Sequence, residues 1–239
     1  DITCKEVDRR VKKIIDISEE QKKPCALLVS KGTFSSYKLR KKERFDRPLF
    51  REQAIELIVE ELHGTEIVIS TTGVTSRELF ENRAKSGQSH EKDFLTVGGM
   101  GHASQIALGI ALEKKDRQVF CLDGDGAFLM HMGSIAINAS MKCSNFKHII
   151  FNNSAHDSVG GQPTVGSKIN FLEIAKSCGY KWVKRVSSIK DIRNSMQELQ
   201  SIKGPALLEV QIKSGFRKDL GRPTNSTNKN RELFMEYIK

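Results

Sequence analysis

Two short apolar runs with a helical pattern between them constrain the fold more than any other feature of this sequence. Val119–Leu122 and His148–Phe151 have the length and the apolar composition of buried strands. Apolar residues recur between them at the spacing of one helix face, namely Met132, Ile135, Ala136 and Ala139. A strand–helix–strand unit brings its two strands side by side and parallel. The sequence therefore predicts two adjacent parallel strands.

Each apolar run ends in a polar turn. The turn Asp123–Gly126 follows the first run, and Asn152–Ala155 follows the second. In open α/β sheets, ligands bind at the carboxyl ends of the strands, where both turns are expected. Gly124 and Gly126 allow the backbone to approach a ligand closely, and Gly126 leads into the amino end of a helix. This arrangement suits a phosphate.

The same turns supply oxygen ligands for a hard cation. The carboxylate of Asp125 and the amide of Asn153 would meet at neighbouring strand ends. Together with one backbone carbonyl, two phosphate oxygens and a water, they would complete the octahedron that Mg²⁺ prefers. The alternative interpretation is an ordinary glycine-rich turn followed by a polar strand end.

From residue 51 onward, helical and strand patterns alternate. This alternation predicts the α/β class, with an open parallel sheet covered by helices on both faces. The further expected helices cover 54–62, 77–84, 103–110, 170–178, 189–199 and 233–238, and the further expected strands cover 67–70, 93–97, 182–186 and 206–212.

The first 34 residues are expected to belong to another domain. The capping box Thr3-x-x-Glu6 begins a helix that runs to about Lys22, and Cys25–Ser30 has the composition of a buried strand. One helix and one strand cannot bury a core, and the chain starts at Asp1 rather than at Met. We expect residues 1–34 to be the end of a preceding domain, 35–50 a linker and 51–239 the main domain. The alternative is a helical decoration on the main domain.

Two further segments contain candidate ligand contacts. In Thr71–Ser76 the hydroxyls and Gly73 could bind phosphate, or Thr75 or Ser76 could cap the following helix. The run Gly98–His102 resembles a dinucleotide fingerprint only loosely, because the position of the last glycine is a serine. The large side chain of Met100 suits either contact with a bound ring or packing in the core.

Composition narrows the classes of partner. The net charge is +10, but the basic residues are dispersed and the sequence has only three Tyr and one Trp, which does not favour nucleic-acid binding. A basic surface suits an anionic substrate. Five scattered cysteines without a C-x-x-C pair, and no apolar run long enough to span a bilayer, favour a cytoplasmic protein without membrane contact.

Three stretches together resemble a known family. Residues 70–81 (STTGVTSRELFE), 94–103 (FLTVGGMGHA) and 119–166 are similar to the diphosphate-binding domain of the phosphonopyruvate decarboxylases, which are thiamine-diphosphate-dependent 2-oxoacid decarboxylases. The resemblance runs from about Pro48 to Pro223, and its most specific part is AHDSVGGQPT at 155–164. The sulfopyruvate decarboxylases have a similar domain. The resemblance implies the thiamine-diphosphate-binding fold, with thiamine diphosphate and Mg²⁺ as cofactors.

The resemblance also implies roles for individual residues. Asp125 and Asn153 would bind Mg²⁺ through their side chains, and Ala155 would bind it through its carbonyl. Met100 would hold the cofactor bent, and the Gly98 carbonyl would accept a hydrogen bond from the aminopyrimidine. The complete set of cofactor contacts expected from the sequence and the resemblance is Thr72, Gly73, Gly98, Met100, Gly124, Asp125, Gly126, Ala127 and Asn153.

The implied reaction is decarboxylation of 3-phosphonopyruvate to phosphonoacetaldehyde and CO₂, with sulfopyruvate as the nearest alternative substrate. His156 and Asp157 are the expected catalytic pair, which would relay a proton or orient the substrate; alternatively they are a structural pair. Val159-Gly160 occupies the place where some relatives carry a catalytic glutamate. A cluster of basic residues near the carboxyl terminus could bind the phosphonate, or could be a solvated terminus: Arg217, Lys218 and Arg222.

The resemblance also implies that this chain lacks part of the active site. The glutamate that activates the cofactor belongs to a pyrimidine-binding domain, and residues 1–34 resemble the end of such a domain. We expect a homo-oligomer, because in this superfamily the two domains around one cofactor usually come from different subunits. Two other classes stay open at this point, namely an NAD-binding dehydrogenase domain and a non-catalytic subunit.

Overall fold

The computed structural model describes residues 4–36 and 45–239, which fall into two units, Asp1–Arg40 and Lys41–Lys239. The first unit contains helix α1 (Cys4–Gln21), which agrees with the helix expected to end near Lys22. Thr3 of the expected capping box lies outside the described residues.

The prediction of a strand at Cys25–Ser30 is wrong. These residues have no regular secondary structure, and all of them are exposed, with Leu28 at 94%. A strand needs the hydrogen bonds of a neighbouring strand and an apolar surface to cover it. None of the described residues pairs with this segment, so its apolar composition alone does not produce a strand.

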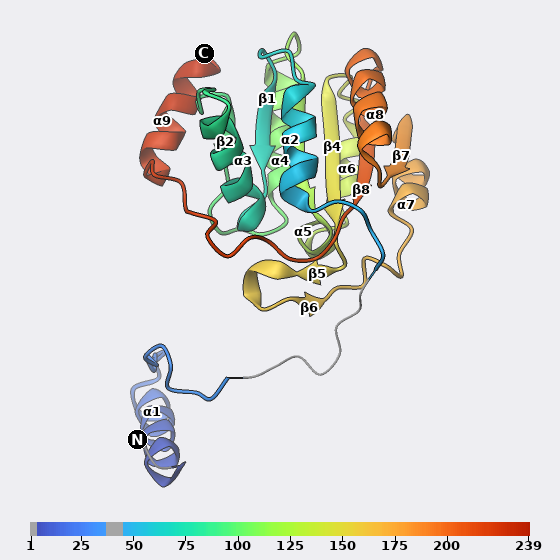
Figure 1. Cartoon of the computed structure of the whole chain (residues 1–239). Coiled ribbons are helices and arrows are strands. Elements are labelled where there is room, and N and C mark those ends of the chain that lie inside the picture. The colour runs from blue at the N-terminus through green and yellow to red at the C-terminus, as the bar shows by residue number, and fades with distance from the viewer. Residues whose placement is uncertain (1–3, 37–44) are drawn as a thin grey trace. The chain divides into compact units, whose positions relative to one another are not determined.

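The second unit is built on a six-stranded, wholly parallel sheet in the order β2-β1-β3-β4-β8-β7 (Figure 1). Its strands are β1 (Ile67–Ser70), β2 (Asp93–Leu95), β3 (Val119–Gly124), β4 (Phe146–Asn152), β7 (Trp182–Val186) and β8 (Ala206–Gln211). Strands β3 and β4 pair in register from Val119↔Phe146 to Gly124↔Phe151. This pairing confirms the two adjacent parallel strands predicted from the sequence.

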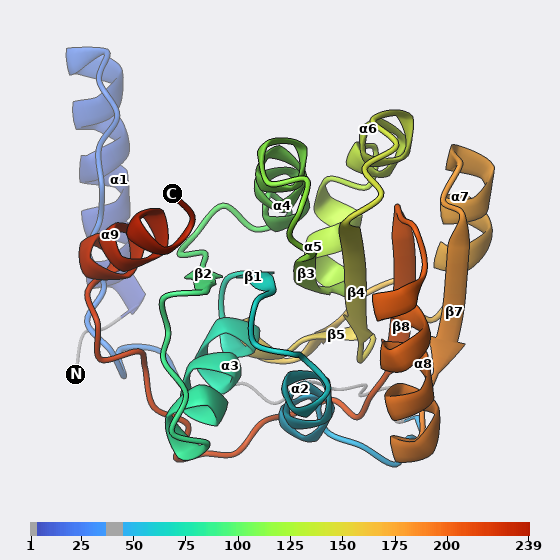
Figure 2. The ribbon, with the colours of Figure 1, turned by 90° about the horizontal axis from the view of Figure 1, so that it is seen from above.

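Helices cover both faces of the sheet, as predicted (Figure 2). One face carries α2 (Arg51–Glu60), α3 (Val74–Lys85) and α8 (Ile189–Ser201). The opposite face carries α4 (Ala103–Glu113), α5 (Asp125–Met130), α6 (Ser134–Ser140), α7 (Phe171–Cys178) and α9 (Thr227–Tyr237). Side chains of β4 alternate between the two cores: Ile149 and Phe151 pack on the first face, and Ile150 on the second. None of the helices in the described residues is long and apolar enough to cross a membrane.

The single helix expected between β3 and β4 is in fact two. Helix α5 begins directly at Asp125, and the turn before Ser134 separates it from α6. The predicted apolar face is only partly correct, because Ile135 and Ala139 are buried but Ala136 is exposed. A period counted from Met132 runs through the turn between the helices, so it misplaces the exposed side of α6.

Helix α3 begins three residues earlier than expected. Its amino-terminal cap is Gly73, with φ of +96°, and no side chain caps it. Thr75 and Ser76 therefore cap nothing; both are buried inside the helix, where the Ser76 hydroxyl donates to the Thr71 carbonyl. Asn170 stands at the expected start of α7 but makes no side-chain cap either.

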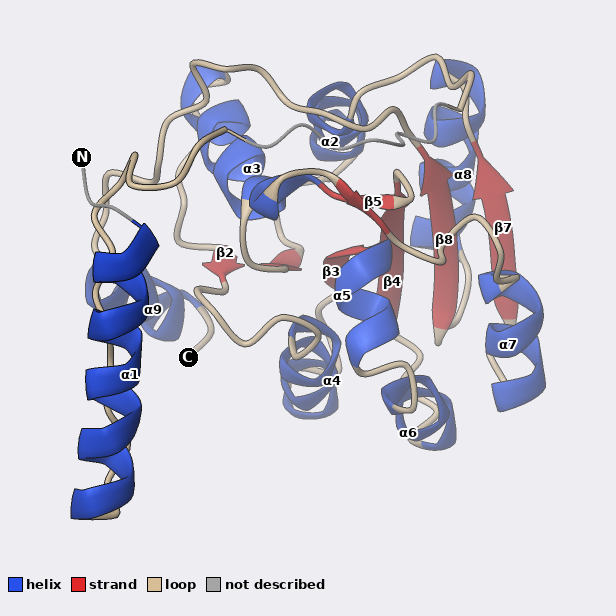
Figure 3. Cartoon of the chain, turned by 90° about the horizontal axis from the view of Figure 1, so that it is seen from below, coloured by secondary structure: helices blue, strands red, loops and turns tan. Residues whose placement is uncertain are grey.

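The loop after β4 contains structure that the sequence pattern did not indicate. Ala155–His156 (β5) and Gln162–Pro163 (β6) form a small antiparallel pair, with a 3₁₀ turn at Asp157–Val159 between them. Figure 3 looks onto the carboxyl edge of the main sheet, with β5 beside α5 at this edge. The carboxyl-terminal segment after β8 returns along the same edge below α3 (Figure 1).

Candidate cofactor and magnesium site

A small cavity of about 50 Å³ lies where β1, β3 and β4 end. Most of the predicted site residues line it: Thr72, Met100, Gly124, Asp125, Gly126, Ala127, Asn153, Ala155, His156 and Asp157. Gly73 and Gly98 are in the adjoining turns but do not line it. The parallel register of the three strands brings these residues together, although they are up to 85 positions apart in the sequence, from Thr72 to Asp157.

Asp125 is a buried carboxylate at the first position of α5, with 2% of its surface exposed. The hydroxyl of Thr164 donates a hydrogen bond to its Oδ2. Burial raises the pKa of Asp125 to about 6, although the Thr164 hydroxyl and the backbone amide of Asn153 oppose the shift. A buried carboxylate that is this costly to ionise would be stabilised by a cation bound beside it.

The side chain of Asn153 is held in one orientation. Its Nδ2 donates to Oδ2 of Asp157 over 2.6 Å, and its Oδ1 accepts from the backbone N–H of Ala155 over 3.0 Å. The amide nitrogen is turned toward Asp157, so the oxygen is the side-chain atom that remains to bind a cation. Asp157 is thus bonded to Asn153, and the substrate or proton role predicted for it stays a prediction.

Asp157 is itself held by partners from distant parts of the chain. Its Oδ2 also accepts from the backbone N–H of Gly215 over 2.9 Å and lies 3.5 Å from Nη1 of Arg51. Arg51 is buried at the start of α2, and its Nε donates to Oε2 of Glu78 over 2.7 Å. Burial raises the pKa of Glu78, while the Arg51 charge lowers it. The Arg51 guanidinium therefore forms ion pairs with two buried carboxylates, Glu78 and Asp157, and Asp157 in turn accepts from Asn153.

Arg51 and Glu78 were not predicted as site residues. Arg51 lies between the expected linker at 35–50 and the expected helix at 54–62, and Glu78 lies near the start of the helix expected at 77–84. No local signal identifies Arg51, because its neighbours Glu52 and Gln53 are polar as well and its buried partners come from distant parts of the sequence.

Gly126 lies under the ring of His156. A Cβ added at this glycine would come within 2.5 Å of Cε1 and 2.6 Å of Nδ1 of the histidine. The ring therefore packs directly on the first turn of α5 and leaves no space for a side chain there. The glycine predicted for close ligand approach is required here for close approach of His156.

The hydroxyls of Thr71 and Thr72 belong to residues that line the cavity. The buried Oγ1 of Thr71, which lines the cavity, has no hydrogen-bond partner among the described residues. Oγ1 of Thr72 accepts from the backbone N–H of Gly98 over 3.0 Å, which ties the two glycine-containing turns together. An unpartnered buried hydroxyl aimed at a cavity fits a site for an oxygen-rich ligand. The donor chemistry of this hydroxyl and of the buried Asp125 carboxylate fits a magnesium diphosphate.

Met100 is only partly buried and lines the cavity, which favours contact with a bound ring over packing in the core. The basic cluster near the carboxyl terminus does not line the cavity. Arg217 is surrounded by carboxylates, with ion pairs to Glu52, Glu81 and Asp219. These carboxylates already compensate its charge, which leaves little for a substrate phosphonate.

Comparison with known proteins identifies relatives of this chain. Phosphonopyruvate decarboxylase from Streptomyces hygroscopicus is 36% identical over 187 residues, which cover 78% of this chain and 45% of that protein. Sulfopyruvate decarboxylase subunit beta from Methanocaldococcus jannaschii is 37% identical over 198 residues, which cover 79% of this chain and 97% of that subunit. The chain thus spans less than half the length of the phosphonopyruvate decarboxylases that it matches.

A solved structure has a similar fold, and a family model matches the sequence. The structure of benzoylformate decarboxylase from Polynucleobacter necessarius superposes with a TM-score of 0.62 at 19% identity, over 74% of this chain and 35% of that one. Residues 73–210 match the family described as thiamine pyrophosphate enzyme, C-terminal TPP binding domain. This match excludes the NAD-binding alternative. The chain therefore belongs to the thiamine pyrophosphate enzyme family and contains its C-terminal, cofactor-binding domain.

Proposed function

We propose that this chain is the diphosphate-binding part of a magnesium-dependent enzyme that decarboxylates 3-phosphonopyruvate to phosphonoacetaldehyde and CO₂. The observation that carries the proposal is the pair Asp125 and Asn153. A buried carboxylate and a fixed amide stand at the ends of adjacent strands, beside the unpartnered hydroxyl of Thr71. The identity to phosphonopyruvate decarboxylases supports the substrate.

The residues that would hold the cofactor are those predicted. Asp125, Asn153 and the carbonyl of Ala155 would bind Mg²⁺, because hard oxygen ligands suit this ion. The backbone N–H groups of Gly126 and Ala127 open α5 and would bind the diphosphate. When bound, thiamine diphosphate supplies the electron sink that a decarboxylation requires.

His156 and Asp157 would have different roles. Asp157 would be a positioning residue, because its carboxylate is already bonded to Asn153, Gly215 and Arg51. The His156 ring makes no hydrogen bond to the described residues, and it lines the cavity. We therefore retain only His156 as a candidate to hold or move a proton near the substrate.

A second part of the protein would complete the site. Residues 1–34 would be the end of a pyrimidine-binding domain that supplies the activating glutamate, and the assembly would be a homo-oligomer. The alternative is a separate partner chain, which the match to nearly the whole length of a sulfopyruvate decarboxylase beta subunit favours. In that case the substrate would be sulfopyruvate.

Turnover of the two acids would test the proposal. The complete enzyme, with its pyrimidine-binding part, is assayed with 3-phosphonopyruvate and with sulfopyruvate, in thiamine diphosphate and Mg²⁺. We expect kcat/KM to favour the phosphonate by at least about tenfold, which corresponds to about 1.4 kcal/mol. Preference for sulfopyruvate would transfer the proposal to the second substrate, and turnover of neither acid would reject both.

A further inference from the structure

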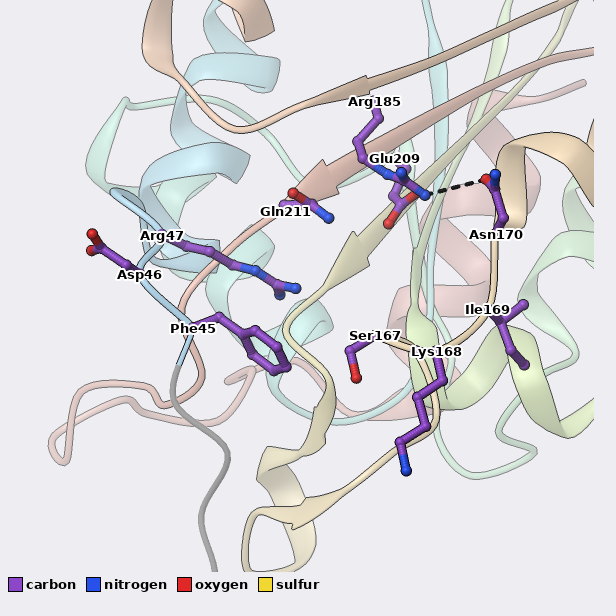
Figure 4. Close-up of a pocket in the computed structure, with 11 residues that line it drawn as sticks. Phe45, Asp46, Arg47, Ser167, Lys168, Ile169, Asn170, Arg185, Glu209 and Gln211 are labelled. Carbon is purple, nitrogen blue, oxygen red and sulfur yellow. Dashed lines mark hydrogen bonds and ion pairs between the residues drawn. The ribbon is translucent and has the colours of Figure 1, made fainter.

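A second, larger cavity lies beside the cofactor site, at the carboxyl ends of β4, β8 and β7 (Figure 4). Its volume is about 480 Å³, which is within the range of small-molecule sites. None of the residues predicted for cofactor or substrate lines it. The lining residues are Phe45, Asp46, Arg47, Gly166, Ser167, Lys168, Ile169, Asn170, Arg185, Glu209 and Gln211.

Arg47 is a buried cation in this cavity without a directly paired carboxylate among the described residues. Only 6% of its surface is exposed, and no carboxylate of the described residues lies within ion-pair distance. Its guanidinium donates instead to the backbone carbonyls of Asn152 and Ile212. These bonds satisfy hydrogens but do not neutralise the charge, which the more distant carboxylates of Asp125 and Glu209 offset only in part.

Arg185 directs a second guanidinium at the same cavity. Burial lowers the pKa of Arg47; the charges of Asp125 and Glu209 oppose this shift, and the charge of Arg185 adds to it. Arg185 Nε donates to Oε2 of Glu209 over 2.8 Å, and Oε1 of the same carboxylate accepts from the Asn152 amide over 2.8 Å. Glu209 therefore pairs directly with Arg185 and Asn152, and it acts on Arg47 only over a longer distance, outside ion-pair range.

The remaining charged groups leave the cavity positive. Figure 4 shows the carboxylate of Asp46 pointing away from the cavity. Lys168 is exposed on the loop before α7 and has no ion pair among the described residues, so it adds positive potential. Ser167 adds a hydroxyl donor. Oδ1 of Asn170 accepts from Nη2 of Arg185 over 3.4 Å, which leaves the amide nitrogen for a ligand.

We propose that this cavity is a second oxyanion site, which binds the phosphate group of a small phosphorylated compound or free phosphate between Arg47 and Arg185. Guanidinium groups recognise phosphate through paired, charge-assisted hydrogen bonds. The bound anion would give Arg47 a direct anionic partner, which none of the described carboxylates provides. Arg47 donates to the carbonyl of Asn152 and lies 3.5 Å from the hydroxyl of Ser154. An anion bound to Arg47 would therefore be connected through this side chain to the loop that contains Asn153.

Titration of the full chain with inorganic phosphate at constant ionic strength, followed by ³¹P NMR and calorimetry, would test the site. The titration is made with and without saturating thiamine diphosphate and Mg²⁺, so that phosphate binding at α5 is separated from binding at Arg47. Ser167→Glu places a negative charge in the cavity at an exposed position. Ser140→Glu, at an exposed position of α6 outside the cavity, changes the net charge equally.

We expect saturable binding that Ser167→Glu weakens at least about tenfold and that Ser140→Glu changes less than about twofold. Arg47→Lys, which keeps the charge but loses the planar fork, should weaken binding as well. Equal affinities of Ser167→Glu and Ser140→Glu, or no saturable binding by the wild-type chain, would overturn the proposal. Binding that Ser167→Glu weakens would support the site even if thiamine diphosphate failed to bind, so the two proposals fail separately.

A second titration with glycerol 3-phosphate distinguishes the sources of the anion. Tighter binding of the ester than of inorganic phosphate, again weakened by Ser167→Glu, identifies a phosphorylated compound as the ligand class. Binding of inorganic phosphate alone identifies the free anion.

Discussion

The Nδ2 of Asn153 donates to Oδ2 of Asp157 over 2.6 Å, four positions along the chain. This bond determines which atom of the Asn153 amide is free to bind a cation. Because Asp157 is in turn bonded to Arg51 and Gly215, the orientation of one candidate ligand depends on three separate parts of the chain. Residues that hold metal ligands in this way contribute to affinity without touching the metal.

Removal of the Asp125 carboxylate should abolish Mg²⁺-dependent binding of thiamine diphosphate. Asp125 is the only charged ligand in the candidate set, whereas Asn153→Ala removes a neutral ligand and should weaken binding less. Calorimetry with Mg²⁺ and thiamine diphosphate measures the affinity of both variants. Asp116→Ala, an exposed aspartate before β3, is the matched control. Undiminished binding by Asp125→Ala would contradict the site assignment.

Asp157→Ala should lower the affinity for Mg²⁺ at a fixed cofactor concentration by about 10- to 100-fold, as is typical when a supporting hydrogen bond to a metal ligand is lost. Asp157→Asn keeps one acceptor for Asn153 and should be affected less. A Mg²⁺ titration followed by calorimetry separates the two. If both variants bound Mg²⁺ as the wild type does, Asp157 would not position Asn153.

The binding of Mg²⁺ should depend on pH through Asp125. Its pKa of about 6 lies above that of an unfolded chain, so the folded apo form binds the proton more tightly. The contribution of this group to apo stability is therefore present below about pH 4 and is lost as the pH rises to about 6. Mg²⁺ needs the carboxylate, so its affinity should fall by up to about tenfold per pH unit below pH 6.

Titrations between pH 5 and pH 8 would measure this dependence. Asp125→Asn cannot ionise, so any binding that remains should lose the pH dependence near pH 6. An affinity for Mg²⁺ that is flat from pH 5 to pH 8 in the wild type would refute the prediction.

Gly126→Ala should destabilise the domain by about 1–3 kcal/mol, because the new methyl group would overlap the ring of His156. His156→Ala should relieve most of this cost in the double variant, which a double-mutant cycle in urea would show. Gly109→Ala, in an exposed position of α4 with open space around it, is the control and should stabilise the helix slightly. Additive effects at 126 and 156 would contradict the contact.

Met100→Ala should lower kcat of the complete enzyme while the melting temperature of the apo form changes little. The side chain is partly exposed and lines the cavity, so its removal leaves no sealed core void. Met100→Leu should be nearly neutral, since volume and apolarity are kept. A large loss of apo stability, with kcat retained per folded molecule, would instead assign Met100 to the core.

The sequence pattern predicted the parts of the site that depend on local signals. The apolar runs at Val119–Leu122 and His148–Phe151 indicated strands, and their polar ends placed Asp125 and Asn153 together. The break between α5 and α6 was missed, because the helical period continues through the turn. Cys25–Ser30 was wrongly predicted as a strand, since strand formation depends on a partner that composition does not reveal.

The contacts that hold Asp157, and through it the Asn153 side chain, could not be predicted from the sequence for a related reason. The folded arrangement of α2, α3 and the carboxyl-terminal segment brings Arg51 and Gly215 to Asp157, and Glu78 to Arg51. No periodicity or short motif records a contact over such separations in sequence. The same holds for Arg47, which lies in the linker expected at 35–50 and is buried against the end of β4.

The hydrogen bond from the Gly215 N–H to Asp157 has a consequence for the order in which the site forms during synthesis. Ribosomes deliver a chain from its amino terminus, and early segments start to fold before later ones emerge. The turns that carry Asp125 and Asn153 emerge long before Gly215, yet the Asp157 carboxylate gains its full set of partners only with that residue. The candidate metal site therefore reaches its final geometry only after the strands of the main sheet have been synthesised.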